Sequence, residues 1–209
     1  MSFQVIVTLG PSILQRATLR EIDALGPCIY RINGAHVAPT EVTRVAAQVR
    51  DILGAEARVM IDLPGNKVRT ANLSTPLRLV AGSLVELADW QVNLRTFHEY
   101  VQPGDTIYAN DSTYRLTVER IEGSTIVLRS HSDGLLQTNK GLHLPGITER
   151  LPFLFDRDRA LMDAACACDL TYVSLSFVRT AADVREARAV LAARTATPPA
   201  LIAKIETAP

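Results

Sequence analysis

The last apolar run of the chain ends in two charged residues whose types and spacing suit chemistry on an anion. Residues 200–203 and 205 are apolar, which is typical of a strand buried on both faces of a parallel sheet. Lys204 and Glu206 alternate at its end, and side chains two positions apart on a strand point the same way. A carboxylate there can hold Mg²⁺, and a lysine beside it can neutralise an anion or move a proton. The alternative is a simple ion pair where the strand reaches solvent.

Strands and helices that would position this pair alternate along the chain. They lie before and after a middle region that lacks this alternation. Cap signals mark three of the helices, with Thr40 and Asp156 as single caps and Thr180 with Asp183 as a capping box. This alternation predicts a parallel sheet in an α/β fold. The expected strands span residues 4–9, 28–32, 58–63, 170–175 and 200–206, and the expected helices span residues 13–25, 39–53, 156–167 and 180–194.

The middle region has the texture of an all-β module. From about Ala71 to His143 there is no strong helical period, and short alternating apolar runs are separated by glycines. This pattern predicts a small all-β domain inserted into the α/β domain, with its hinges near Thr70 and near residues 140–141.

Composition and charge set the limits on class and location. A chain of 209 residues can form one domain, or one domain that carries a smaller insertion. The formal net charge of +0 gives no reason to expect a nucleic-acid partner. No apolar run approaches the ~20 residues of a membrane span, and we find no signal-peptide pattern, so we expect no membrane association and a cytoplasmic location. Cys28, Cys166 and Cys168 lack a zinc-binding spacing and are expected to be buried free thiols.

Several separated motifs, taken in order, resemble those of the pyruvate kinase family. Each one is weak alone, but together they run essentially from end to end, and the all-β insertion after the third strand matches that family as well. The motifs are residues 7–12 (VTLGPS, similar to T-x-G-P-S), 31–36 (RINGAH, R-L-N-F-S-H), 62–70 (DLPGNKVRT, D-x-K-G-P-E-I-R-T), 140–146 (KGLHLPG, K-G-V-N-L-P-G), 176–184 (SFVRTAADV, S-F-V-R-x-A-x-D-V) and 203–206 (AKIE, A-K-I-E).

The resemblance implies a (β/α)₈ TIM-type barrel with a β-barrel cap domain. About the first five barrel strands are present, so we expect a partial barrel. The expected domains are residues 1–70 for the first part of the barrel, 71–142 for the inserted small all-β barrel, and 143–209 for the continued and incomplete barrel. The implied reaction is phosphoryl transfer between phosphoenolpyruvate and ADP, which gives pyruvate and ATP.

The resemblance also implies roles for individual side chains. Phosphoryl transfer needs little covalent help and much neutralisation of charge. Arg31 and Arg69 sit at strand ends and can fork onto phosphate oxygens, and Lys204 can neutralise the transferring phosphoryl group and the enolate oxygen. Arg31, Arg69 and Lys204 are therefore the expected catalytic residues, and together with Ser176 they are expected to bind the substrates. The alternative for the two arginines is a surface ion pair.

Two cations are implied as cofactors. Glu206 is expected to hold the Mg²⁺ that bridges substrate oxygens. Asn33, Asp62 and the backbone carbonyl of Leu63 match positions that hold a K⁺ ion. For Asn33 and Asp62 the alternative is turn capping.

The sequence departs from the family pattern at positions that bear on these roles. Ala35 stands where the family has a serine hydroxyl that ligates K⁺. Lys67 stands where the family has a glutamate, and its fixed ammonium can replace a monovalent cation electrostatically. Residues 110–112 read Asn-Asp-Ser in place of Asp-Asp-Gly. Asp111 can still reach a closed site, but Ser112 where glycine is expected puts the same turn in doubt.

The length of the chain leaves the whole assembly and its function open. A barrel of about five strands cannot close, so its two end strands would expose apolar edges. Three alternatives are open: the sequence belongs to a longer protein, its final strand is incomplete and mobile, or the chain pairs with itself or with a partner chain that completes the barrel. We expect a pyruvate kinase-like phosphotransferase that has no appreciable kinase activity as this chain alone. The alternative is a non-kinase relative, either a complex-forming or regulatory subunit or a Mg²⁺-dependent enzyme acting on an enolate or 2-oxo acid.

Overall fold

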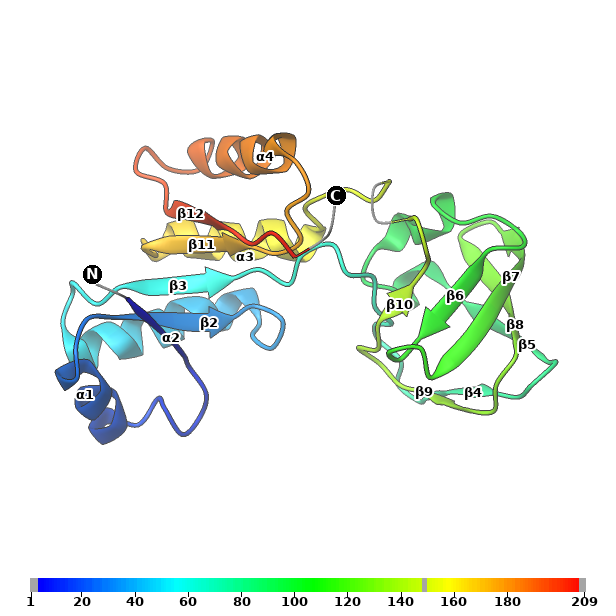
Figure 1. The fold of residues 1–209 in the computed structure, drawn as a ribbon, viewed down its shortest axis with the longest axis horizontal. Coiled ribbons are helices and arrows are strands. Elements are labelled where there is room, and N and C mark those ends of the chain that lie inside the picture. The colour runs from blue at the N-terminus through cyan, green and yellow to red at the C-terminus, as the bar shows by residue number, and fades with distance from the viewer. Residues whose placement is uncertain (1–3, 148–149, 207–209) are drawn as a thin grey trace. The chain divides into compact units, whose positions relative to one another are not determined.

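A computed structural model describes residues 4–147 and 150–206 and divides the chain into two compact units (Figure 1). The α/β unit comprises Met1–Gly65 and Phe153–Pro209, and the β unit comprises Asn66–Pro152. The chain therefore leaves the α/β unit once, forms the β unit, and returns. The predicted domain boundaries at residues 70/71 and 142/143 remain predictions beside these changeover points.

Parallel strands form the sheet of the α/β unit, in the order β1-β2-β3-β11-β12. The α/β class and the partial barrel expected from the sequence are confirmed by this arrangement. The strands are β1 (Val5–Thr8), β2 (Cys28–Asn33), β3 (Val59–Asp62), β11 (Tyr172–Leu175) and β12 (Ala200–Ala203), and the helices are α1 (Arg16–Ala24), α2 (Pro39–Leu53), α3 (Asp156–Ala167) and α4 (Ala181–Ala192).

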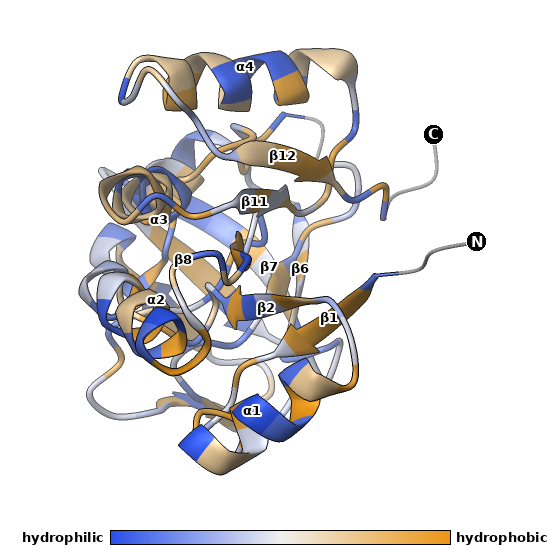
Figure 2. Ribbon diagram, turned by 90° about the vertical axis from the view of Figure 1, so that its left-hand side faces the viewer, coloured by the Kyte–Doolittle hydropathy of each residue, from blue (hydrophilic) through white to orange (hydrophobic). Residues whose placement is uncertain are grey.

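The main core of this unit lies between the sheet and its helices. Val42, Val45 and Val49 recur at helical spacing along α2 and are all buried. They share one buried cluster with Tyr30 and Ile32, which alternate along β2. Figure 2 shows α2 and α3 on the same side of the sheet. Full burial of a valine or isoleucine contributes about 1.5–3 kcal/mol, so this cluster holds the strands in their places.

Two of the helix starts test the cap predictions. α2 begins after Ala38 and has Pro39 at its first position, so the prediction of Thr40 as its cap is wrong. Proline is favoured at that first position because its missing N–H has no helical partner to lose. The predicted capping box of α4 is confirmed, since Thr180 N donates to Asp183 Oδ2 at 2.9 Å and Asp183 N donates to Thr180 Oγ1 at 3.4 Å.

The start of α3 corrects another prediction. The N-cap position is Phe155, and Asp156 is the first helical residue. The carboxylate that accepts from Phe155 N is that of Asp158, at 2.9 Å. Asp156 was expected to be the cap, but its backbone is already helical, so that prediction is wrong.

The two outer strands of the sheet, β1 and β12, are exposed. The expectation that residues 200–206 form a strand buried on both faces is wrong, because β12 pairs only with β11 in the described sheet and contains no buried residue. Val5 and Ile6 of β1 are 45% and 48% exposed, and Ile205 beyond β12 is 73% exposed. The predicted apolar edges of an open barrel are therefore present.

Antiparallel strands make up the β unit, which confirms an inserted all-β module. One sheet has the order β10-β6-β7-β8-β5, and β4 pairs with β9 in a second sheet. Leu116 and Val118 on β7 alternate with more exposed residues and pack the interior together with Ile126 and Leu128 on β8. The elements are β4 (Leu77–Leu79), β5 (Leu84–Leu87), η1 (Asp89–Gln91), η2 (Arg95–Glu99), β6 (Thr106–Ala109), β7 (Tyr114–Glu122), β8 (Thr125–Ser130), β9 (Gly134–Leu136) and β10 (Leu142–His143).

Two further findings bear on the class of protein. Over residues 4–147 and 150–206, no helix has the length and apolar character needed to cross a membrane. Cys28, Cys166 and Cys168 are free, and of these Cys28 is buried while the other two are half-buried.

Candidate functional site

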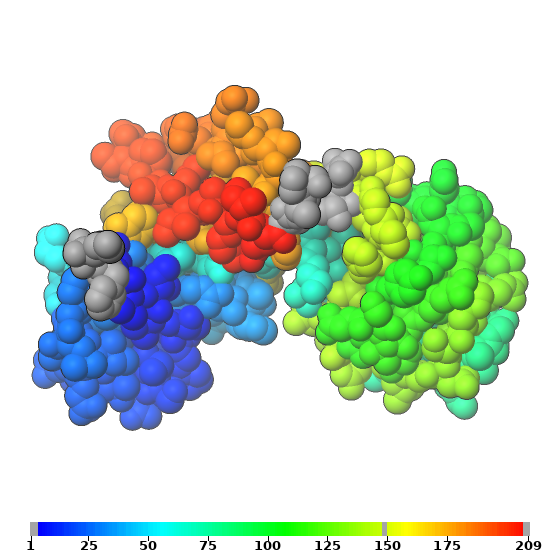
Figure 3. Space-filling model, viewed as in Figure 1, coloured from blue at the N-terminus to red at the C-terminus, as the bar shows by residue number. Residues whose placement is uncertain are grey.

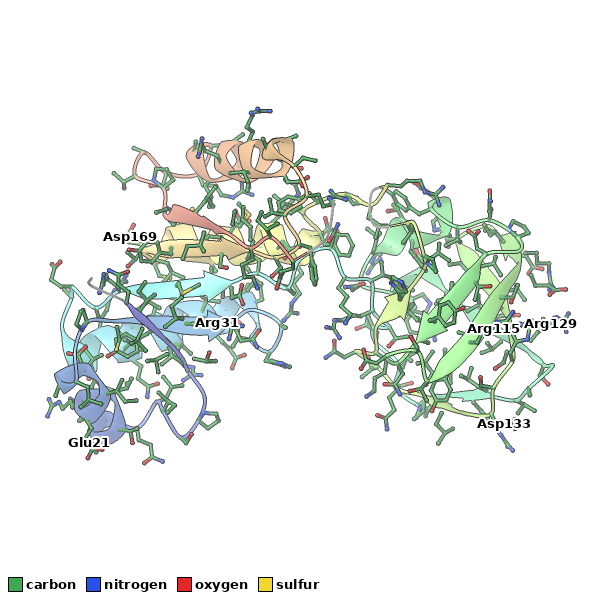
Figure 4. All side chains as sticks on the ribbon, in the orientation of Figure 1. Glu21, Arg31, Arg115, Arg129, Asp133 and Asp169 are labelled. Atoms are coloured by element: carbon green, nitrogen blue, oxygen red, sulfur yellow. The ribbon has the colours of Figure 1, made fainter. Side chains whose placement is uncertain are left out.

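The carboxylate of Asp62 lies between two cations that come from other strands of the sheet. Arg31 on β2 donates to Asp62 Oδ2 from Nε at 2.9 Å and from Nη2 at 2.6 Å. Lys204 follows β12, and its Nζ lies 3.3 Å from Oδ2 and 3.1 Å from Oδ1. Figure 4 labels Arg31 on β2. The parallel sheet thus brings three predicted site residues together at the carboxyl ends of its strands.

One oxygen of Asp62 is buried without a hydrogen-bond partner among the described residues. Asp62 is 5% exposed, and its Oδ1 makes no hydrogen bond among the described residues. The ammonium of Lys204 is 3.1 Å away but lies in a direction that forms no hydrogen bond with Oδ1. Buried polar atoms normally have a partner, so this oxygen suits a cation.

Glu206 lies beside Lys204 and is held by a loop. Its Oε1 is 3.6 Å from Lys204 Nζ, so the predicted pair does project together. Its Oε2 accepts from Phe177 N at 3.0 Å. Phe177 has a φ of 55°, which is rare for a bulky residue and costs on the order of 1–3 kcal/mol. The loop after β11 therefore stores strain at the residue whose N–H orients Glu206.

Ser176 connects the loops that follow β11 and β3. Its buried hydroxyl donates to the carbonyl oxygen of Leu63 at 2.6 Å. Gly65 packs directly on the same loop, because a Cβ there would lie 2.9 Å from Ser176 Cβ and 2.9 Å from Phe177 Cδ2. Gly65 also has a φ of +71°, so a side chain is disfavoured on two counts. The contact that the structure gives Ser176 is thus to the loop that carries Leu63.

The loops that follow β2 and β3 are also in contact. Gly34 N donates to the carbonyl oxygen of Asp62 at 2.9 Å, and a Cβ at Gly34 would lie only 2.6 Å from that oxygen. Asn33 Oδ1 accepts from Ala35 N at 3.1 Å, which is the turn-capping contact that the sequence left open. A side-chain oxygen has two lone pairs, so this contact leaves Asn33 able to bind a cation as well.

Arg69 and Lys67 belong to the β unit and are described within it. Arg69 Nη1 donates to the carbonyl oxygen of Asn139 at 3.2 Å. Lys67 Nζ lies 3.9 Å from Asp111 Oδ1, and the side chains are 42% and 89% exposed. Asp111 sits in the β6–β7 turn, where residues 110–112 all have positive φ values of 51–67°. The roles predicted for Arg69 and Lys67 remain predictions.

Comparison with known proteins identifies the family. Residues 2–209 match the family model described as pyruvate kinase, barrel domain. The chain belongs to the pyruvate kinase family. It is 31% identical to the pyruvate kinase of Aeropyrum pernix over 195 residues, which cover 90% of the chain and 42% of that protein. It is 28% identical to that of Thermococcus litoralis and 25% identical to that of Clostridium perfringens, over 97% of the chain and 45% and 46% of those proteins.

The chain thus spans less than half the length of these pyruvate kinases. Family members typically use Mg²⁺ and K⁺, and the donor chemistry of the site can be compared with those ions. Mg²⁺ is usually held by one or two carboxylates together with substrate oxygens, and Glu206 supplies one such carboxylate. The described residues contain no group of three or more His, Cys, Asp or Glu side chains that could hold a metal by themselves. For K⁺, the Oδ1 of Asp62, which makes no hydrogen bond in the described structure, and the carbonyl of Leu63 are suitable oxygen ligands.

Sequence reasoning missed three residues that contact the candidate site or its loops. Thr8 Oγ1, at the end of β1, accepts from Arg31 Nη1 at 2.9 Å. Arg157 and Asp158, in the first turn of α3, hydrogen-bond to the loops that follow β2 and β3. Thr8 lies in the first motif and at the end of a strand, and these two features could have indicated it as a site residue. Nothing in the sequence indicates that the start of α3 lies against these loops.

Asp158 is the most buried acidic group in the described structure. It is 0% exposed, and burial raises the pKa of its carboxyl group to about 6. Hydrogen bonds from Phe155 N and Gly65 N, and the charges of Arg157 and Arg159, act in the opposite direction and lower the pKa. The group is therefore largely ionised at neutral pH despite its burial.

Proposed function

We propose that this chain supplies part of a pyruvate kinase active site, for phosphoryl transfer between phosphoenolpyruvate and ADP to give pyruvate and ATP. The observation that carries the proposal is the buried Asp62 carboxylate between Arg31 and Lys204, with Glu206 next to Lys204. A structural role alone has no need of such a charged group, because burying charges costs free energy that hydrophobic packing avoids. A reaction on a multiply charged phosphate does need it.

The two cations are suited to bind an anion. The described contacts of Arg31 use one N–H on each of its three nitrogens, so each Nη keeps one donor for a phosphate oxygen. Lys204 contacts Asp62 through a mobile four-carbon chain, so its ammonium can move toward a transferring phosphoryl group or an enolate oxygen. Arg69 and Ser176 complete the proposed substrate-binding set.

The metals would be held by residues of the same group. Bound Mg²⁺ supplies a positive charge that bridges the substrate oxygens, and Glu206 is the residue that would hold it. For the monovalent cation there are two alternatives: Asn33, Asp62 and the Leu63 carbonyl would hold K⁺, or the Lys67 ammonium would replace it. Binding of phosphoenolpyruvate that is unchanged when K⁺ is replaced by tetramethylammonium would support Lys67, and weaker binding would support K⁺.

The proposal includes a larger assembly. The relatives are more than twice as long as the stretch they share with this chain, and β1 and β12 are unpaired on their outer sides in the described sheet. A continuation of the chain, a second copy or a partner chain would complete the barrel. We also propose a cytoplasmic location, where ADP and ATP are available.

The proposal can be tested by titrating phosphoenolpyruvate into the chain with and without Mg²⁺, using calorimetry. Binding is expected to require Mg²⁺ and to weaken at least tenfold in Lys204→Gln, because the ammonium faces the substrate charge. Arg188→Gln is the matched control, since Arg188 is an exposed cation on α4. A wild-type chain with no Mg²⁺-dependent binding would contradict the proposal. A coupled assay is expected to find no turnover by the chain alone, and turnover at a rate typical of enzymes would refute that expectation.

A second candidate is a non-kinase relative that keeps Mg²⁺-dependent enolate chemistry or acts as a subunit of a complex. Two features favour it, namely the missing hydroxyl at Ala35 and the Asn-Asp-Ser sequence at residues 110–112 in place of Asp-Asp-Gly. For such an enzyme, Mg²⁺-dependent exchange of the pyruvate methyl protons with D₂O is expected without any nucleotide. A subunit without enzymatic activity would show neither exchange nor turnover.

A further inference from the structure

Asp158 binds two segments of the α/β unit, one at the point where the chain leaves this unit and one just after the chain returns to it. Its Oδ1 accepts from Gly65 N at 3.1 Å, and its Oδ2 accepts from Phe155 N at 2.9 Å. Gly65 is the last residue of the α/β unit before the β unit begins, and Phe153 is the first residue on the return. One buried carboxylate therefore fixes the outgoing and the incoming chain within the α/β unit.

The neighbouring residue, Arg157, binds the other loop of the site. Its Nη2 donates to the carbonyl oxygens of Gly34 at 3.0 Å and Val37 at 2.9 Å, with a longer contact of 3.4 Å to Ala35, and its Nε lies 3.3 Å from Gly34 O. These carbonyls follow Asn33 directly. A planar guanidinium with several N–H donors suits such a set of carbonyls, because it can satisfy them from one rigid group.

These contacts reach beyond what the helix itself requires. A residue at the third helical position stabilises a helix start by accepting one N–H, which Asp158 does with Phe155 N. The bond to Gly65 N joins residues 93 positions apart and contributes nothing to the cap. A serine or asparagine would cap without burying a charge, whereas only a carboxylate offers acceptor oxygens on both sides. Helix capping therefore does not explain the hydrogen bond that Asp158 Oδ1 accepts from Gly65 N.

The fixed loops are the ones that carry the proposed cation ligands. Gly34 follows Asn33, and Gly65 comes two residues after Leu63. Gly34 N also donates to the backbone oxygen of Asp62, so a shift of either loop moves the other. We propose that Arg157 and Asp158 are positioning residues, which set the loops after β2 and β3 so that Asn33, Asp62 and Leu63 face one site. What they position rests on the proposed function, whereas the fixing of the loops does not.

The first part of the test is amide hydrogen exchange followed by NMR in the full chain. Asp158→Asn keeps the shape of the side chain but retains one acceptor oxygen, so one of its two N–H partners must face an amide group. Exchange at Gly65 or Phe155 is expected to accelerate at least tenfold, while amides in the middle of α3 keep their rates. Asp156→Asn is the matched control, because it removes the same charge from an exposed position in the same helical turn.

Arg157→Gln provides an independent variant, and its exposed position makes a folding failure unexpected. Exchange at Gly34 or Ala35 is expected to accelerate, with partial recovery in Arg157→Lys, which keeps the charge but not the fork. Arg159→Gln is the control, since Arg159 pairs with Glu186 on α4 and contacts neither loop in the described structure. Unchanged loop exchange in both Asp158→Asn and Arg157→Gln would overturn the inference, and so would a uniform acceleration over the whole α/β unit.

The second part measures Mg²⁺-dependent binding of phosphoenolpyruvate in the same variants. Both positioning variants are expected to weaken binding about tenfold or more, and both controls are expected to bind as the wild type does. Wild-type affinity in variants whose loops exchange faster would overturn the positioning of the site. If the wild type itself does not bind, the proposed function fails, and the exchange rates still decide whether Arg157 and Asp158 fix the loops.

Discussion

At the scale of the residue, the buried carboxyl of Asp158 makes stability depend on pH in an unusual direction. Burial raises its pKa to about 6, above the value near 3.9 of an unfolded chain. The folded protein therefore binds a proton more tightly than the unfolded protein between these values. The stability from this group is fully present below about pH 4 and is lost as the pH rises through about 6. A carboxylate kept charged at such a cost fits a positioning role better than a stabilising one.

The pH dependence that Asp158 gives to folding stability can be measured directly. From pH 4 to pH 7, the wild type is expected to lose on the order of 3 kcal/mol of unfolding free energy relative to Asp158→Asn, which has no titrating group at that position. Urea unfolding of both proteins across this range measures the difference. Asp156→Asn should follow the wild type, and parallel curves for the wild type and Asp158→Asn would contradict the assignment.

The β6–β7 turn holds a serine, Ser112, in a strained left-handed backbone conformation. Asn110, Asp111 and Ser112 have φ values of 53°, 51° and 67°. Asn and Asp tolerate this region through local hydrogen bonds, whereas serine has less to offset its cost. Ser112 stands where the family pattern has glycine, and its positive φ is the conformation that glycine adopts most easily.

Ser112→Gly is therefore expected to raise the unfolding free energy by up to about 1 kcal/mol, because relief of strain exceeds the added entropy of the unfolded chain. Thermal or urea unfolding measures the change. Ser124, in the β7–β8 turn, is outside the set of positive-φ residues in the described structure, so Ser124→Gly should lower stability instead. Equal effects at the two serines would show that the turn conformation is not the cause.

At the scale of the element, the capping box of α4 could be predicted because all its parts are local. Thr180 and Asp183 exchange hydrogen bonds, and Asp183 also accepts from Arg179 N at 2.9 Å. Burial alone would raise the pKa of Asp183, but the hydrogen bonds from the Arg179 side chain and from these backbone N–H groups lower it on balance. The start of α4 thus combines a cap with a favourable charge near the positive end of the helix dipole.

Thr180→Ala is expected to cost about 1 kcal/mol of unfolding free energy, since it leaves a helix N–H without its acceptor. Gln15 is the control: it occupies the N-cap position of α1 and makes no side-chain cap hydrogen bond in the described structure. Gln15→Ala should change stability by only a few tenths of a kcal/mol. Urea unfolding compares the two, and equal losses would argue against a specific role of the Thr180 hydroxyl.

The failed cap predictions show what local sequence cannot decide. Thr40 and Asp156 are good cap residues by type, but the helices begin one or more residues earlier, where Ala38 and Phe155 already have extended backbones. Local sequence also does not determine which other strands pair with a given strand. The run at residues 200–205 resembles a fully buried strand, and yet β12 lies at an edge of the described sheet.

At the scale of the molecule, the motifs and the alternation of strands and helices were sufficient to predict the fold class of each unit. Both signals are short-range patterns that can be read from the sequence. Arg31, Asp62 and Lys204 could be expected near one another only because parallel strands end on the same side of a sheet. The hydrogen bond between Lys204 and Asp62 spans 142 positions, and the partners of each charge came only from the structure. Arg157 and Asp158 lie on a helix whose contact with the loops depends on packing over more than 90 positions.

The open sheet predicts how the chain behaves in solution. Figure 2 shows the apolar strands β1 and β12 at opposite edges of the sheet, and Figure 3 shows the blue and red ends of the described chain at the surface. Such edges present unpaired backbone groups together with apolar side chains, which favours pairing with another strand. The isolated chain is therefore expected to self-associate, and light scattering over a concentration series measures this.

Ile6→Lys and Ile205→Lys should each reduce this self-association, because a charge at an edge cannot be buried without a partner. Leu25→Lys is the control, since Leu25 is 89% exposed but belongs to the C-terminal end of α1 and to neither edge strand. If the association instead arises from general surface hydrophobicity, Leu25→Lys will reduce it as much as the edge variants do. A selective effect of the edge variants would locate the contact at the strands that a complete barrel pairs, and would make a chain or segment that pairs with both edges the natural candidate for restoring activity.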